Sequence, residues 1–224
     1  MSPGKASAIV AGEGPLAAAA AIALATAGFG RIGLAGAASA ERAAGKLGLL
    51  VPETVVEPYP VGLEPANAGA IVALADVVLA CGSPEEQQLV NDACCEERVP
   101  LVVGELHGHA GLVLSVRPGA TACRRCASPV EPQTAGGVGD GLGEGGLEAL
   151  AGIVGSLQAL EAVKLVTGTG APLLDRLLTI HGSDMSQTIV PIAAQDGCPA
   201  CARVPAACAR LPGACARVPG TPHS

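Results

Sequence analysis

Aromatic side chains are almost absent from this chain of 224 residues, which holds one Phe, one Tyr and no Trp. Broad ring surfaces on which bases or sugars stack are therefore not expected. Half of the residues are nevertheless hydrophobic. Most of these are Ala, Val and Leu, so the core must be built from small side chains, and the length suits one domain with appendages.

Positive charge is also scarce. The sequence has 13 Lys and Arg against 20 Asp and Glu, a net charge of -7, which disfavours nucleic acid and anionic membranes as partners. The apolar run Leu16–Ala27 after Lys5 resembles a secretory signal but is too short to span a bilayer. Because Glu13 interrupts the apolar residues here, we expect a cytoplasmic protein that does not enter a membrane, with a secreted protein as the alternative.

Cysteine, by contrast, is arranged in a pattern. Cys123-Arg-Arg-Cys126 and Cys198-Pro-Ala-Cys201 each have the two-residue spacing that lets two sulfurs face one point. Four thiolates would complete a closed, structural zinc site that joins two distant segments. The alternatives are two disulfides, or surface thiols that share this spacing by chance.

The first forty residues predict the opening of a nucleotide-binding α/β fold. A short strand at Ser7–Val10 precedes a G-x-G-x-x-A turn from Gly12 to Ala17, and a helix from Pro15 to about Ala27 and a strand at Arg31–Ala35 follow. We therefore predict an α/β fold with a Rossmann-like, mostly parallel sheet flanked by helices. The later expected strands are Thr54–Pro60 at an edge, Asp76–Cys81, Pro100–Gly104, Leu112–Val116, Leu177–His181 and Thr188–Ile192; the later helices are Glu41–Gly48 (or a loop), Pro65–Ala75, one after Ser83, and Leu147–Val166.

The expected phosphate site is chemically weak. Such a turn holds phosphate through backbone N–H groups and a helix N-terminus, but Glu13 puts a carboxylate among them. Its charge could point into solvent or occupy the anion position itself. The second strand continues as Leu34-Ala35-Gly36-Ala37-Ala38, without an acid to hold ribose hydroxyls. His107 and His109, expected on one face of a strand, form a further candidate metal site that has no evident third ligand.

Two segments have a different composition. Residues 127–146 are rich in Gly, Pro and Ser and are expected to form a mobile crossing loop within a domain that spans residues 1–201. After Cys201, a Cys-Ala-Arg-x-Pro sequence recurs every seven residues. Proline at this frequency excludes a coiled coil, so 202–224 is expected to be a disordered or polyproline-like tail.

The order of several motifs resembles the ThiF/MoeB/HesA family, bacterial relatives of ubiquitin-activating enzymes. The stretches that carry the resemblance are Gly30-Arg-Ile-Gly-Leu34, Leu89-Val-Asn-Asp-Ala-Cys94, Pro100-Leu-Val-Val-Gly104, both cysteine pairs and Gly155-Ser-Leu-Gln-Ala-Leu-Glu-Ala-Val-Lys164. The resemblance implies a dimeric α/β protein with structural zinc. It also implies that ATP and magnesium are used to adenylate the C-terminal Gly-Gly of a ubiquitin-like sulfur-carrier protein.

The chain departs from that family at the positions that would hold ATP. Glu13-Gly14-Pro15 interrupts the phosphate loop, Gly36 and Ala38 replace acids, and Ser83 replaces an Asp near the fourth strand. A segment near Ala40–Gly45 with a phosphate-contacting Arg is missing, while Lys46 is the candidate match for a phosphate-contacting lysine.

Three hypotheses follow. The first is a degenerate member that binds a carrier-protein tail or an active homologous subunit, with weak or lost ATP use. The second is a working adenylyltransferase whose unconventional nucleotide site uses Gly12, Gly14, Arg31, Lys46 or the histidines. The third is another nucleotide-binding Rossmann-like protein.

Overall fold

The computed structural model describes residues 2–36, 40–128 and 143–201. The chain forms one sheet of eight strands in the order β3-β2-β1-β4-β5-β6-β7-β8. Strands β1 to β5 are parallel, whereas β5 to β8 form an antiparallel meander. The strands are β1 (Ser7–Ala11), β2 (Arg31–Ala35), β3 (Val55–Tyr59), β4 (Val77–Ala80), β5 (Leu101–His107), β6 (Ala110–Val116), β7 (Arg176–His181) and β8 (Gln187–Pro191).

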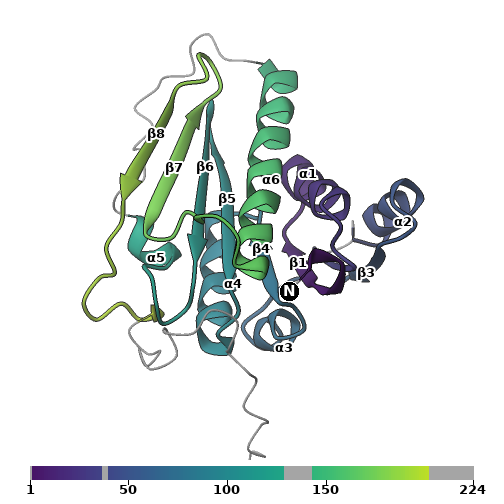
Figure 1. Cartoon of the computed structure of the whole chain (residues 1–224), viewed down its shortest axis with the longest axis horizontal. Helices are drawn as coiled ribbons and strands as arrows, with labels where there is room; N and C mark the ends of the chain where they lie inside the picture. Colours follow the sequence, from purple (N-terminus) through teal and green to yellow (C-terminus); the bar gives the residue numbers. More distant parts are fainter. Residues whose placement is uncertain (1, 37–39, 129–142, 202–224) are drawn as a thin grey trace, which may run out of the picture.

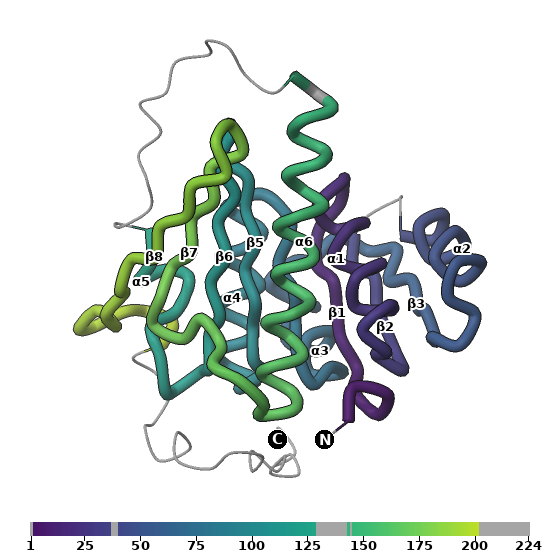
Figure 2. Tube along the Cα trace, turned by 45° about the horizontal axis from the view of Figure 1, so that its top comes forward, coloured from purple at the N-terminus to yellow at the C-terminus, as the bar shows by residue number. Residues whose placement is uncertain are grey.

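Helices cover both faces of this sheet, as Figures 1 and 2 show. α1 and α6 lie together on one face, and α3, α4 and α5 lie on the other. The helices are α1 (Gly14–Thr26), α2 (Ala40–Leu50), α3 (Ala68–Val72), α4 (Pro84–Glu97), α5 (Arg124–Ala127) and α6 (Gly143–Thr167), after a short 3-10 turn, η1 (Pro3–Lys5). The predicted α/β architecture, with a mostly parallel sheet flanked by helices, is confirmed.

Small side chains let α1 and α6 pack closely, as the composition requires. A methyl group placed on Gly155 in α6 would lie 2.6 Å from the backbone nitrogen of Ala20 in α1. α6 also reaches the sheet through Gln158, which is fully buried. Its Nε2 donates to Ala80 O and Val102 O at 3.1 and 3.3 Å, and thereby satisfies carbonyl groups between β4 and β5.

Local sequence signals explain where α1 and α4 begin. Each has a Pro in its first turn, where the missing N–H is not needed. In α4, Ser83 Oγ accepts from Glu86 N at 3.3 Å and Glu86 Oε2 accepts from Ser83 N at 2.8 Å, a complete capping box. The exposed carboxylate of Glu13, at the cap position of α1, makes no such bond.

Some predicted bounds were wrong. The helix expected at Pro65–Ala75 is only Ala68–Val72, and α5 and α6 extend into the predicted crossing loop, of which residues 129–142 lie outside the described residues, as does the tail at 202–224. His107 and His109 do not share a strand face, because His107 ends β5 and the turn through Gly108, with φ of 55°, places His109 before β6.

α6 is also the longest apolar segment. By length and composition Gly145–Thr167 could cross a membrane, but half of its most apolar window is buried inside the protein. A core helix of this length has the same properties, and the contacts of α6 with α1 and the sheet are those of a core helix.

Candidate nucleotide crevice and four-cysteine centre

A crevice opens at the carboxyl ends of β1, β2 and β4. β1 lies between β2 and β4 in the parallel part of the sheet. From β1 the chain first adds β2 and β3 on one side, and it then returns to place β4 on the other side of β1. Open α/β sheets bind ligands at such a switch point. The cavity measures about 390 Å³ and is lined by Ala11, Gly12, Glu13, Ala35, Gly36, Gly62, Leu63, Ala80, Cys81, Gly82, Ser83, Glu86, Gln87 and Val90.

The glycine turn, Gly12-Glu13-Gly14, requires glycine at both ends. Gly12 has φ of 121° and Gly14 φ of 88°, which side-chain-bearing residues rarely adopt. A methyl group on Gly12 would also lie 2.4 Å from the backbone nitrogen of Gly82, which follows β4. The turn therefore brings the β1 and β4 ends together and leaves only the side chain of Glu13 free to extend.

A second cavity, of about 450 Å³, adjoins the first at the glycine turn and lies between α1 and α2. Lys46 and Arg42 on α2 line it, together with Gly12, Gly14 and mainly apolar side chains. The structure thus brings together three of the four predicted nucleotide-binding residues: Gly12, Gly14 and Lys46.

Arg31 is placed elsewhere. It is the first residue of β2 and pairs in register with Ser7 at the start of β1, so it lies at the opposite sheet edge from the glycine turn. Its guanidinium forms an exposed ion pair with Glu57, at 2.6 Å between Nη2 and Oε2, which raises the pKa of Arg31. Arg31 lines neither cavity.

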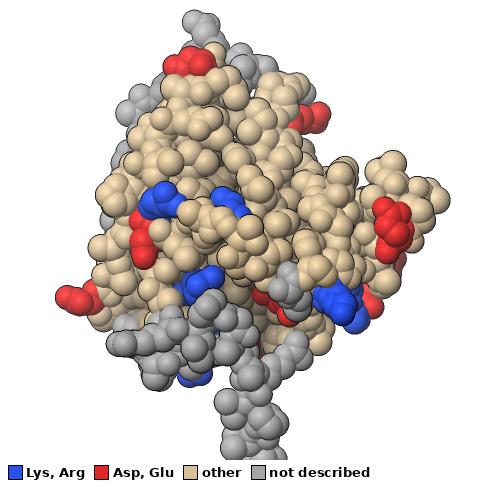
Figure 3. Space-filling model, viewed as in Figure 1, with Lys and Arg blue, Asp and Glu red and all other residues tan. Residues whose placement is uncertain are grey.

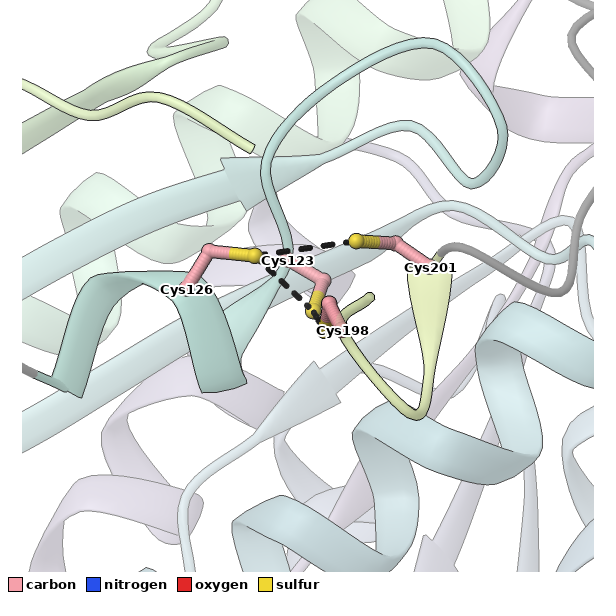
Figure 4. Close-up of side chains that lie close together, drawn as sticks. All are labelled: Cys123, Cys126, Cys198 and Cys201. Carbon is pink, nitrogen blue, oxygen red and sulfur yellow. Dashed lines mark hydrogen bonds between the residues drawn. The ribbon is translucent and has the colours of Figure 1, made fainter. Parts of the chain in front are cut away.

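The four predicted metal ligands meet at one point. Figure 4 shows the side chains of Cys123 and Cys126, at the start of α5, directed toward those of Cys198 and Cys201 near the end of the described chain. The Sγ–Sγ distances are 3.9 Å for Cys123–Cys126 and 3.6 Å for both Cys123–Cys198 and Cys126–Cys201. All four sulfurs lie within 4.8 Å of one another, and none forms a disulfide.

These distances fit a tetrahedral tetrathiolate centre. A zinc–sulfur bond of about 2.3 Å gives sulfur–sulfur edges of about 3.8 Å in a regular tetrahedron. Gln195 N donates to Cys126 Sγ at 3.3 Å, which is the kind of N–H bond that supports a metal-bound thiolate. With all four positions taken by thiolates, the centre can bind a metal structurally but offers no open coordination site.

A fifth cysteine, Cys95 in α4, also contacts the centre. It is 1% exposed and hydrogen-bonds with Cys123. This bond is the main cause that lowers the pKa of Cys123, to about 4, and it raises the pKa of Cys95. Cys94, which precedes it, is equally buried, at 0% exposed.

A buried polar network connects the centre with the crevice. Arg124, which follows Cys123 and is 2% exposed, donates from Nη2 to Glu105 Oε2 at 2.7 Å and from Nε to Gln87 Oε1 at 3.1 Å. Its backbone N–H donates to Asn91 Oδ1 at 2.8 Å. Gln87 in turn donates to Gly82 O at 3.0 Å and lines the crevice.

The sequence did not reveal this network. Glutamine and asparagine on a helix and arginine beside a cysteine are usually solvated, and their partners lie between 19 and 37 residues away. The only available signal was that Gln87, Asn91 and Cys95 are spaced four residues apart and therefore share one face of α4.

Comparison with known proteins relates this architecture to one family. A profile of the ThiF family matches residues 35–200. The SAMP-activating enzyme E1 of Haloferax volcanii is 36% identical over 167 residues, which cover 74% of this chain and 61% of that protein. Protein HesA of Nostoc sp. is 32% identical over 67% of this chain and 58% of its own length.

A third relative and a solved structure also match. The adenylyltransferase and sulfurtransferase MOCS3-1 of Drosophila pseudoobscura pseudoobscura is 38% identical over 62% of this chain but only 31% of its own length. The chain thus spans about a third to three fifths of these relatives. The crystal structure of Escherichia coli MccB with ATP covers 89% of the chain with a TM-score of 0.73 at 16% identity, a likeness of fold. Because the profile covers most of the chain and the fold agrees, this protein is a member of the ThiF family.

Proposed function

We propose that this chain is a partner-binding member of the ThiF family with weak or lost ATP use. Its partner is the C-terminal Gly-Gly tail of a ubiquitin-like carrier protein, or an active homologous subunit. The observation that carries this proposal is the charge of the crevice. Glu13 and Glu86 line it, and none of its described lining residues is Lys or Arg. A triphosphate needs cationic groups and magnesium at such a site.

Relatives support the choice of partner. One is named an activating enzyme for SAMP and another an adenylyltransferase and sulfurtransferase. Activation of a carrier tail by adenylation is therefore the reaction from which we derive this chain's role. Loss of one preorganised charge-stabilising group costs about two to three orders of magnitude in rate, so loss of several would leave binding without useful turnover.

A second candidate, a working adenylyltransferase with an unconventional nucleotide site, has one observation in its favour. Lys46 and Arg42 line the cavity that adjoins the glycine turn, so a phosphate chain that entered this cavity would meet two cations. In this alternative the phosphates lie between α1 and α2 rather than in the crevice itself.

We infer that the four cysteines hold a structural zinc ion. The chemical basis is the tetrahedral sulfur spacing described above and the preference of zinc for four thiolates. Metal analysis should give about one zinc per chain. Full occupancy in a variant that lacks both Cys198 and Cys201 would refute the four-cysteine site.

A dimer is also part of the proposal. Two apolar side chains are exposed, Ile22 of α1 at 45% and Leu160 of α6 at 54%, and Figure 3 shows an almost entirely uncharged surface over α1 and α6. Such a face favours burial against another subunit. Sedimentation of the full chain should give a dimer, and Leu160→Glu should shift it to the monomer. We also expect a cytoplasmic location for a protein with this kind of partner.

One experiment separates the two candidate functions. A peptide ending in Gly-Gly is immobilised and its binding by the full chain is measured, and exchange of pyrophosphate into ATP is followed with the same peptide. We expect binding without exchange above background. Exchange that depends on the peptide and is lost in Lys46→Gln would instead establish the working enzyme. A chain that neither binds the peptide nor exchanges pyrophosphate would contradict both.

A further inference from the structure

The carboxyl end of β2 carries no acid of its own. In nucleotide-binding folds of this topology, an acidic side chain at this point accepts hydrogen bonds from the ribose hydroxyls. Here β2 ends at Ala35, and Gly36 follows in both cavity linings. A methyl group on Gly36 would lie 2.8 Å from Gly12 O, so this position cannot hold a side chain without displacing the glycine turn.

Glu13 fills the space that Gly36 leaves. Its Cγ lies 2.9 Å from where a β-carbon on Gly36 would be. The side chain of the glycine turn thus extends across to the end of the neighbouring strand β2. The carboxylate is exposed, lines both cavities, and makes no hydrogen bond or ion pair with the described residues. It is therefore free to accept hydrogen bonds from a ligand.

The same carboxylate works against phosphate. Beside the backbone N–H groups of the glycine turn, its negative charge opposes the anion that such a turn otherwise binds. Glu86 adds a second carboxylate to the crevice lining. A ligand with hydroxyl donors and little negative charge suits these surroundings, whereas a triphosphate does not.

We propose that Glu13 is a specificity-determining residue that replaces the missing acid of β2 and makes the crevice a site for a ribonucleoside or its monophosphate, with discrimination against triphosphates. This inference rests on the crevice of the proposed function. It also explains how weak triphosphate use and a retained nucleotide fold occur together, because one side chain favours the ribose and disfavours the phosphates.

Calorimetry on the full chain tests the proposal, with adenosine, 2′-deoxyadenosine and magnesium ATP as probes. The wild-type chain should bind adenosine roughly tenfold or more tightly than 2′-deoxyadenosine, because a hydroxyl bonded to a carboxylate is lost. Glu13→Gln keeps the size of the side chain but removes its charge. Glu13→Gln should reduce the preference for adenosine over 2′-deoxyadenosine severalfold. It should also raise the affinity for ATP relative to that for adenosine by about tenfold. Glu53→Gln, at an exposed turn before β3, is the matched control and should change neither ratio.

Three results would overturn the proposal: no adenosine binding by the wild-type chain, equal binding of the two nucleosides, or an unchanged ratio in Glu13→Gln. Binding of the Gly-Gly peptide is measured separately on the same preparations. Peptide binding that persists when the nucleoside results fail would leave the proposed function intact and reject Glu13 as the ribose acid.

Discussion

Arg124 offers the sharpest test of how the fold is held together around the four-cysteine centre. Its guanidinium is buried with Glu105, of which 6% is exposed, and with Gln87, which is fully buried. Arg124→Met preserves the aliphatic stem but removes every N–H of the guanidinium. The amide oxygen of Gln87 would then remain buried without this donor, and the carboxylate of Glu105 would keep the partly exposed His107, whose Nε2 lies 2.7 Å from Oε1.

The expected loss follows from that burial. Removal of one partner of a buried, hydrogen-bonded ion pair typically costs about 3–5 kcal/mol, because the other charge stays desolvated. For a chain of this size, each kcal/mol corresponds to a shift of about 2–4 °C in Tm. We therefore expect Arg124→Met to lower Tm by roughly 6–20 °C. Arg124→Met combined with Glu105→Leu removes both charges and should lose much less than Arg124→Met alone.

Arg125 is the matched control. It is adjacent in sequence and forms a two-point pair with Asp92, at 2.7 and 2.6 Å, but a third of each side chain is exposed. Such partly exposed pairs contribute about 1 kcal/mol or less. Arg125→Met should therefore lower Tm by only a few degrees, although it removes the same charge from the same short helix.

Urea unfolding, followed in parallel with metal content, decides the matter. A loss of less than 1 kcal/mol in Arg124→Met with unchanged metal would refute the reasoning, since the neighbouring His107 would then suffice to hold the buried carboxylate of Glu105. The reasoning would also be refuted if the double variant lost as much free energy of unfolding as its two single changes lose together. Metal analysis is needed because a variant that had lost its metal would be destabilised for a different reason.

Three further predictions concern glycine and cysteine. Gly155→Ala should lower the free energy of unfolding by about 1–3 kcal/mol, measured by thermal unfolding, because its methyl group would lie 2.6 Å from Ala20 N. Gly152→Ala is the control in the same helix, and because open space surrounds it the change should be neutral or stabilising. Gly12→Ala should destabilise by at least as much, because of its φ of 121° and the 2.4 Å approach to Gly82; an unaltered Tm would contradict this. Cys123→Ser should bind less metal and lose thermal stability together, whereas a buried thiol outside the centre, changed as Cys81→Ser, should leave metal content unaltered.

The sequence predicted the elements of this fold better than their contacts. Apolar runs and glycine turns lie within the segments whose structure they determine. Most of the strands and helices are therefore found where periodicity and turn chemistry predict them. The spacing within each cysteine pair is local too, and it correctly predicted two sulfurs facing one point. That the two pairs meet depends on the strand order, which brings the segment between β6 and α5 close to the segment after β8.

Residues whose roles depend on non-local contacts could not be placed from sequence. Arg31 was a predicted nucleotide-binding residue of an unconventional site. It is the first residue of β2, however, and the parallel register with β1 places it at the amino ends of the strands, opposite the glycine turn. Glu13 looked like a defect in a phosphate loop. Its contact with Gly36 joins residues 23 positions apart and becomes visible only when β1 and β2 are side by side.

α4 explains why the two parts of the candidate site belong together. Three buried residues at intervals of four form one stripe along this helix: Gln87 faces the crevice, Asn91 binds the backbone of Arg124, and Cys95 bonds with Cys123. Gln87 also accepts a hydrogen bond from Arg124. All three residues therefore contact α5 or the cysteine centre. A metal bound to Cys123 would therefore also restrain Arg124, which hydrogen-bonds with Gln87, and Gln87 in turn donates to the carbonyl of Gly82. Although such a metal would have no open coordination position, we expect its removal to loosen this wall of the crevice.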